Sequence, residues 1–125
     1  MKAASSPARY SFDQRWSPAL KEDGHVQVSA YFLNHYHALH PYPLTYGEAM
    51  FVIHLMQFKW GPDAPFPSYA TLAQRMGTSI KTARRFAASL EQKTYLAREA
   101  RTGTTNLFHL GPLMHALVAL KNTPK

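Results

Sequence analysis

Residues Pro67–Gln92 read PSYATLAQRMGTSIKTARRFAASLEQ, and this stretch decides the fold. Ser68 stands where it can cap a helix that runs to about Met76, because serine hydroxyls accept hydrogen bonds from the free amides of a first helical turn. Gly77 then ends that helix, and Ser79 can cap the next one, which extends to about Gln92. The stretch therefore predicts two helices joined by a tight turn.

The apolar residues of this stretch predict how the two helices pack. Ala73 is small enough for a close approach between helices, and Gly77 permits a turn that a Cβ atom would obstruct. At helical spacing, Ile80, Ala83 and Phe86 form one stripe, and we expect all three to face the core. Lys81, Thr82, Arg84 and Arg85 would then lie off the packed stripe.

Elements on both sides of the pair give a mainly α fold with a small β-hairpin. A capping box of Thr45 and Glu48 opens a dense apolar helix upstream, and the proline-rich segment 61–67 follows it as a loop. Two short β-rich runs between residues 95 and 110 flank a Thr-Gly-Thr turn, which predicts a hairpin. The run 111–121, with Pro112 in its first turn, predicts a closing helix.

The N-terminal region gives weaker signals. Residues 1–24 mix alanine, serine, proline and charges without a period, so we expect a flexible arm, pinned by Tyr10, Phe12 or Trp16. Alternation of apolar and polar residues over 26–30 suggests a short strand or an extended lead-in.

Composition narrows the class of function. The 125 residues include 14 basic and 7 acidic side chains, which gives a formal charge of +7 and favours polyanionic partners. No cysteine is present, which excludes disulfides and thiolate metal sites, and no apolar run is long enough to span a membrane. Seven scattered acids offer little for acid-base chemistry, so we expect no enzymatic activity and no cofactor. From the positive charge and the lack of a membrane-spanning run, we expect a cytoplasmic, nucleoid-associated protein.

The histidine-rich segment raises the question of a metal site. His35, His37 and His40 have the spacing of a candidate zinc site, but no cysteine or carboxylate lies near them in sequence. We expect these histidines to pack among the neighbouring tyrosines, with no metal bound. His54 falls in an apolar helix and is expected to be a hydrogen-bonded core residue.

The positive charge is concentrated around the helix pair. Between Ser68 and His109 there are seven arginines and lysines and two glutamates, which accounts for +5 of the total +7. A helix of this kind fits the major groove of B-DNA, where arginine and lysine donate to guanine and threonine contacts a base or a phosphate. The alternative, a solvated helix face, remains open.

Several spaced positions carry a resemblance to a known family. Pro67-Ser68, Leu72-Ala73, Gly77, Leu90-Glu91 and Thr105-Asn106 resemble the winged helix-turn-helix modules of bacterial, phage and plasmid replication initiators and related transcriptional regulators. The resemblance implies a winged-helix domain over 25–125, with its core at 45–110, an aromatic N-terminal extension and a C-terminal helix. One departure concerns Gln92-Lys93-Thr94, which stand where the family often has a glycine.

Three groups of candidate DNA-binding residues follow. The recognition helix would contribute Ser79, Lys81, Thr82, Arg84 and Arg85. The start of the preceding helix would hold a phosphate through Ser68, Tyr69 and Thr71. The hairpin would act as a wing through Arg98, Arg101, Thr102, Thr104 and Asn106. The alternatives are that Tyr69 packs on the loop and that the hairpin tip carries only a cross-strand Arg–Glu pair.

These residues predict a sequence-specific double-stranded DNA-binding protein, in the first place a transcriptional regulator of bacterial or mobile-element origin. Two alternatives stay open. One is an origin-binding replication factor of a phage or plasmid. The other is a docking module that binds a protein through the aromatic residues Tyr31, Phe32, Tyr36, Tyr42 and Tyr46. We also expect a homodimer, because the apolar C-terminal run Leu113, Leu117, Val118 and Leu120 can bury against a second copy.

Overall fold

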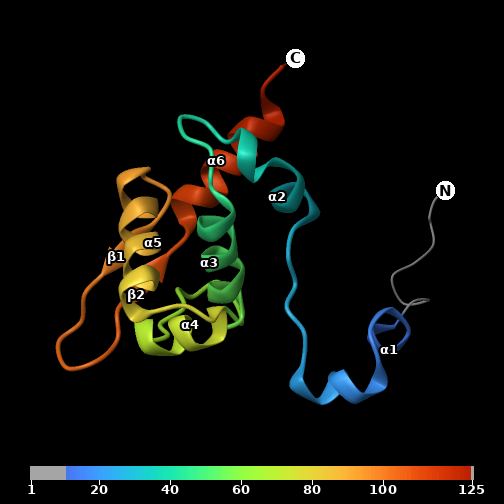
Figure 1. The fold of residues 1–125 in the computed structure, drawn as a ribbon. Helices are drawn as coiled ribbons and strands as arrows, with labels where there is room; N and C mark the ends of the chain where they lie inside the picture. The colour runs from blue at the N-terminus through green and yellow to red at the C-terminus, as the bar shows by residue number, and fades with distance from the viewer. Residues whose placement is uncertain (1–10, 125) are drawn as a thin grey trace.

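A computed structural model describes residues 11–124, so Tyr10 and the first part of the expected arm lie outside the described residues. Figure 1 shows a helical body with one hairpin and an N-terminal segment that extends away from it. The elements in chain order are α1 (Phe12–Arg15), the 3₁₀ helix η2 (Pro18–Asp23), α2 (Ala30–His35), the 3₁₀ helix η3 (Tyr36–Ala38), α3 (Tyr46–Met56), α4 (Tyr69–Met76), α5 (Ile80–Gln92), β1 (Ala97–Glu99), β2 (Leu107–His109) and α6 (Gly111–Asn122).

The body is a mainly α fold with a small antiparallel hairpin, which confirms the expected fold class. Helices α3, α4 and α5 pack on one another, and β1 pairs with β2 in a register that sets Arg98 opposite Phe108. One buried cluster joins these elements, with Phe51, Leu72, Leu90 and Phe108 almost fully enclosed. Burial of apolar side chains at about 25 cal/mol per Å² is the main force that holds them together.

The buried cluster extends beyond residues 45–110 in both directions. Phe32, Leu39 and Leu44 join it from the N-terminal side, and Leu113 and Leu117 join it from α6. The aromatic extension and the closing helix therefore belong to the same core as the helix pair.

Local signals in the sequence located the helix ends correctly. The side chains of Thr45, Ser68 and Ser79 each accept a backbone hydrogen bond at the start of α3, α4 and α5. Gly77 follows α4 with φ of 70°, and the amide of Thr78 donates to the carbonyl of Ala73, as in a Schellman motif. The two-helix arrangement with its tight turn is therefore confirmed.

The expected packing of Ile80 is wrong. Ala83 and Phe86 do turn inward, Ala83 fully, whereas the side chain of Ile80 is 44% exposed. The physical reason is its place at the first residue of α5, where its side chain lines an open groove on the surface instead of the core.

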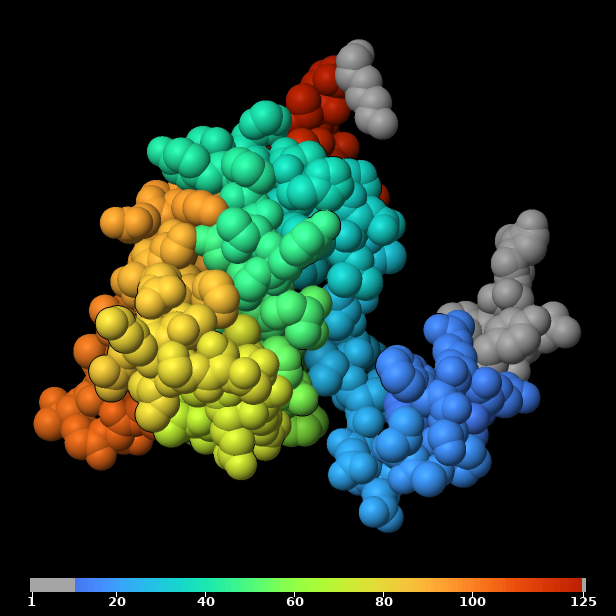
Figure 2. All heavy atoms as spheres, viewed as in Figure 1, coloured from blue at the N-terminus to red at the C-terminus, as the bar shows by residue number. Residues whose placement is uncertain are grey.

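The N-terminal predictions also need correction. Residues 26–30 form no strand: Ala30 already begins α2, which Ser29 caps through a bond from the amide of Phe32, and no strand among residues 11–124 pairs with this segment. The described part of the arm contains two short helical segments and stands apart from the body in Figure 2. Trp16 does not pin it, since its side chain is 72% exposed, and the ring of Phe12 lies against His25 rather than the core.

The structure at the end of α5 shows how the chain does without the glycine that the resembled family often has after this helix. Thr94 has φ of 66°, a left-handed conformation that glycine adopts without strain. The amides of Thr94 and Tyr95 donate to the carbonyls of Glu91 and Leu90, which completes a Schellman motif with a threonine in the glycine position. Burial of Tyr95 and Leu90 beside each other holds this strained residue in place.

Replacing Thr94 by glycine should stabilise the protein. Relief of the left-handed strain, partly offset by the greater freedom of glycine in the unfolded chain, predicts a gain of about 0.5–1 kcal/mol in the free energy of unfolding. Urea denaturation of T94G measures this gain. The matched control is T102G in the hairpin turn, where φ is not positive and glycine should give no stabilisation. A T94G variant less stable than the parent would contradict this account.

Candidate nucleic-acid interface

The first turns of α5 present two free cations to solvent. Lys81 and Arg85 are exposed and lie one helical turn apart, so they share a face. Neither takes part in an ion pair with any residue between positions 11 and 124. The Ser79 and Thr82 hydroxyls at this end are engaged in the cap, because the Ser79 hydroxyl accepts from the Thr82 amide at 3.0 Å and donates to the Thr82 Oγ1 at 3.0 Å.

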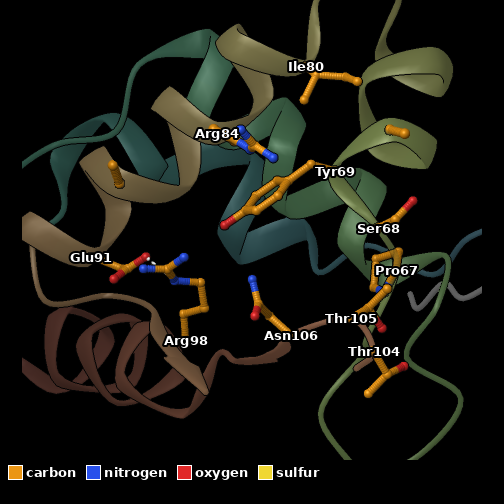
Figure 3. A pocket seen from close by; sticks show the side chains of 12 residues that line it. Pro67, Ser68, Tyr69, Ile80, Arg84, Glu91, Arg98, Thr104, Thr105 and Asn106 are labelled. Carbon is orange, nitrogen blue, oxygen red and sulfur yellow. Dashed lines mark ion pairs between the residues drawn. The ribbon is translucent and has the colours of Figure 1, made fainter. Parts of the chain in front are cut away.

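Beside this face lies a groove between the start of α4, the middle of α5 and the hairpin (Figure 3). Its volume is about 720 Å³. The candidate residues that line it are Ser68, Tyr69, Arg84, Arg98, Thr104 and Asn106. The fold thus brings together members of all three predicted groups, which lie up to 38 positions apart in the sequence.

Two arginines in the groove have different internal partners. The guanidinium of Arg84 lies over the Tyr69 ring, with its central carbon 5.5 Å from the ring centroid. The Nε of Arg98 lies 3.0 Å from the Oε1 of Glu91, in an ion pair drawn in Figure 3. Arg84 therefore turns sideways from the face of Lys81 and Arg85, towards the groove.

Arg101 of the hairpin packs against Phe66 in the loop before α4. Arg101 donates from Nε to the carbonyl of Thr105 at 2.8 Å, and its guanidinium lies 5.2 Å from the centroid of Phe66. Thr102 and Thr104 are exposed at the tip. The cross-strand Arg–Glu pair considered for the tip is absent among the described residues, because Arg98 reaches across to α5 and Glu99 pairs with His109.

At the start of α4 the polar groups serve mainly the helix. The hydroxyl of Ser68 accepts from the amide of Thr71 at 3.0 Å and donates to its Oγ1 at 3.0 Å. The ring of Tyr69 meets the buried Phe108 edge-on at 5.7 Å, so this tyrosine packs on the hairpin rather than on the loop. Its hydroxyl end still points into the groove in Figure 3.

Sequence reasoning missed three residues of this region. Glu91 was read only as the end of a helix, Phe66 only as part of a loop, and Ile80 as a core residue. The structure makes Glu91 and Ile80 part of the groove wall and places Phe66 beneath Arg101. The apolar spacing of α5 places Ile80 on the core stripe and so misled the prediction, and the other two depend on contacts across the fold.

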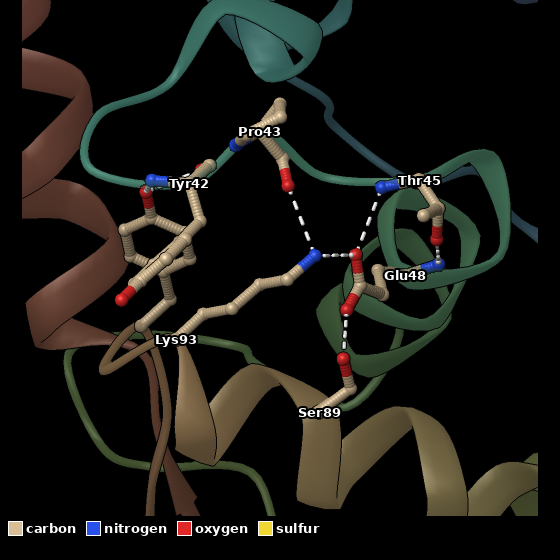
Figure 4. Close-up of polar contacts among 7 residues, drawn as sticks. Tyr42, Pro43, Thr45, Glu48, Ser89 and Lys93 are labelled. Carbon is tan, nitrogen blue, oxygen red and sulfur yellow. Dashed lines mark hydrogen bonds and ion pairs between the residues drawn. The ribbon is translucent and has the colours of Figure 1, made fainter.

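A buried carboxylate fixes α5 in this orientation (Figure 4). Glu48 in the first turn of α3 is only 2% exposed. Its Oε1 lies 2.6 Å from the ammonium of Lys93 and accepts from the amide of Thr45 at 2.8 Å, while Ser89 donates to its Oε2. Lys93 also donates to the carbonyl of Pro43 at 3.0 Å. The network joins α3, the C-terminal half of α5 and the loop before α3.

Hydrogen bonds keep Glu48 ionised. Burial raises the pKa of this carboxyl, but the bonds from Lys93, Ser89 and the Thr45 amide, together with the charge of Lys93, lower it by more. The pKa therefore lies below its ordinary value of 4.5. Ionised Glu48 stabilises the fold above that pH, and the stabilisation is lost as pH falls through the lowered pKa.

The histidines of the aromatic segment make local contacts. The ring of His35 stacks on Tyr31 at 4.0 Å between centroids, and His37 is hydrogen-bonded to the carbonyl of Asn34. Within residues 11–124, no three histidine or acidic side chains come close enough to hold a metal ion. The same part of the chain contains no helix with the length and apolar character needed to cross a bilayer.

Replacing Glu48 by glutamine should destabilise the protein in a pH-dependent way. Loss of one partner of a buried pair, with Lys93 still able to reach water, predicts a decrease of about 2–3 kcal/mol in the free energy of unfolding at pH 7. The difference from the parent should shrink as pH falls through the pKa of Glu48. Urea denaturation between pH 3 and pH 7 measures it, with E99Q, in an exposed pair, as a control that stays within about 0.5 kcal/mol. A constant difference across that pH range would refute this role.

Comparison with known proteins assigns this architecture to a family. The model of the DnaD N-terminal domain matches residues 28–125, which covers α2 to α6 and leaves the arm outside. No curated protein matches the chain. The matched family is replication-related. With more than half of its length matched, the chain belongs to the DnaD N-terminal domain family.

Proposed function

We propose that the protein is a non-enzymatic, sequence-specific double-stranded DNA-binding protein with a winged helix-turn-helix mode of binding. Helix α5 enters the major groove, and the hairpin acts as the wing. The observation that carries this proposal is the pair of exposed cations Lys81 and Arg85 in the first two turns of α5, neither of which has an ion-pair partner within the described part of the chain. In helix-turn-helix proteins these turns contact base edges.

The dimensions of the face support the proposal. Thirteen residues at 1.5 Å each give α5 a length of about 20 Å, and the major groove, about 12 Å wide, admits an α-helix. The exposed residues Lys81 and Arg85 can reach guanine acceptors, while Arg84 and Arg101 lie to the sides, where a helix in the groove meets sugar and phosphate.

Family membership favours a replication role over transcriptional regulation. The matched family is replication-related, and nothing in the fold points specifically to a regulator. We therefore place the protein among factors that bind DNA to recruit replication proteins. This is the origin-binding replication factor that the sequence left open as an alternative to a transcriptional regulator.

Protein docking is the second candidate function. Tyr46 is 82% exposed and Tyr42 is also exposed, next to the start of α3. The other aromatic residues of the segment are mostly occupied, because Phe32 is buried and Tyr31 and Tyr36 pack against the core. Retention on random duplex DNA in moderate salt separates the two functions, since a docking surface of this kind does not need a polyanion.

Arg85 offers the most direct test of base recognition. Duplexes selected from a random pool supply the cognate site, and fluorescence anisotropy then compares the parent with R85A on cognate and scrambled duplexes. Loss of a base contact should cost about 1–3 kcal/mol on the cognate site and much less on the scrambled one. R15A removes an equal charge from the arm, outside the interface, and should leave both affinities nearly unchanged.

Equal losses on both duplexes would reduce Arg85 to a phosphate contact. Unchanged binding by R85A and by a matching K81A variant would contradict the proposed use of α5.

A further inference from the structure

Among residues 11–124, Glu91 is the one acidic side chain that lines the groove, and several other lining residues offer donors to an anion. The donors are the guanidinium groups of Arg84 and Arg98, the side-chain amide of Asn106 and the hydroxyl of Tyr69, all directed into the groove in Figure 3. The Glu91 carboxylate, in its ion pair with Arg98, takes a place on this guanidinium that an external anion can also take.

The two arginines of the groove are not equivalent. Arg84 lies over an aromatic ring, which leaves its charge unneutralised and its N–H groups free at the edge of the guanidinium. The Nε of Arg98 lies 3.0 Å from the Oε1 of Glu91 in an ion pair, so the charge of Arg98 is neutralised within the protein. In the free protein the groove therefore holds one available guanidinium and one that is occupied.

We propose that the Glu91 carboxylate occupies a phosphodiester subsite of the groove, and that a DNA backbone phosphate binds Arg98 there by displacing it. This proposal rests on the proposed function and names the ligand class of the groove. Arginine recognises carboxylate and phosphate with the same planar fork of donors, so one anion can take the place of the other.

The exposure of the pair makes the exchange feasible. The Arg98 side chain is 42% exposed and that of Glu91 31%, so water reaches both groups. Exposed ion pairs contribute little to stability, and a displaced glutamate can turn into solvent without leaving a buried charge. Glu91 thus acts as an internal competitor that weakens binding to any phosphate and limits non-specific retention on DNA.

The neighbouring acid provides a matched control. Glu99 follows Arg98 on β1, so its side chain points to the other side of the strand and does not line the groove. Its Oε1 lies 2.9 Å from the Nε2 of His109. E91Q and E99Q change the net charge equally, so a difference in DNA binding between the two variants is due to the loss of the carboxylate in the groove and not to the overall charge.

Salt dependence of duplex binding tests the proposal. Anisotropy titrations of the full chain between 50 and 200 mM salt, on one duplex, give the slope of log K against log salt. In the parent, the displaced Glu91 carboxylate takes up a cation while the bound phosphate releases one. E91Q has no such uptake, so its slope should be steeper by roughly 0.9 than that of the parent, and its affinity advantage should shrink by roughly threefold across this range. E99Q should keep the parental slope, and E91Q/R98Q should return to it.

The outcomes separate this inference from the function beneath it. Parental binding with equal slopes for E91Q and E99Q would overturn the subsite while leaving DNA binding intact. A steeper slope for E91Q that persists in E91Q/R98Q would overturn the assignment of Arg98 as the phosphate ligand. Absence of salt-dependent duplex binding by the parent would overturn the proposed function and, with it, this subsite.

Discussion

The buried carboxylate of Glu48 is the constraint on which the interface depends. A charge removed from water is costly unless hydrogen bonds and an opposite charge surround it. Here Ser89 on α5, Lys93 at the C-cap of α5 and the Thr45 amide at the N-cap of α3 supply them. Because Ser89 lies on α5 and Lys93 follows directly at its C-cap, the rotation of α5 about its own axis is tied to α3. That rotation buries Ala83 and leaves Arg85 in solvent on the opposite side.

The net charge overstates the number of cations that are available on the surface to an anionic ligand. Lys93 is used inside the fold, and Arg98 is neutralised by Glu91, whereas Lys81 and Arg85 have no acidic partner among residues 11–124. In the groove beside α5, the two arginines differ in their neighbours. The aromatic ring beneath Arg84 leaves its charge available, whereas the carboxylate of Glu91 neutralises that of Arg98.

Sequence reasoning succeeded where a local signal decides the structure. Caps at Thr45, Ser68 and Ser79, the glycine after α4 and the hairpin turn each act within a few residues, so they can be read directly from the chain. The strand expected at 26–30 failed because strand formation needs a distant partner. The pairing of Glu48 with Lys93 spans 45 positions, and no local pattern reveals it. The structure brings several of the predicted site residues to one groove, but their partners Glu91 and Phe66 were not anticipated.

Backbone amide chemical-shift mapping tests the central claim most directly. On titration with a selected cognate duplex, the account predicts that the largest shifts fall on residues 79–85, with a second group in the hairpin and at residues 68–71. Shifts confined to the loop at 42–46 and to α6, with the first turns of α5 unaffected, would contradict the account and point to a protein-docking domain.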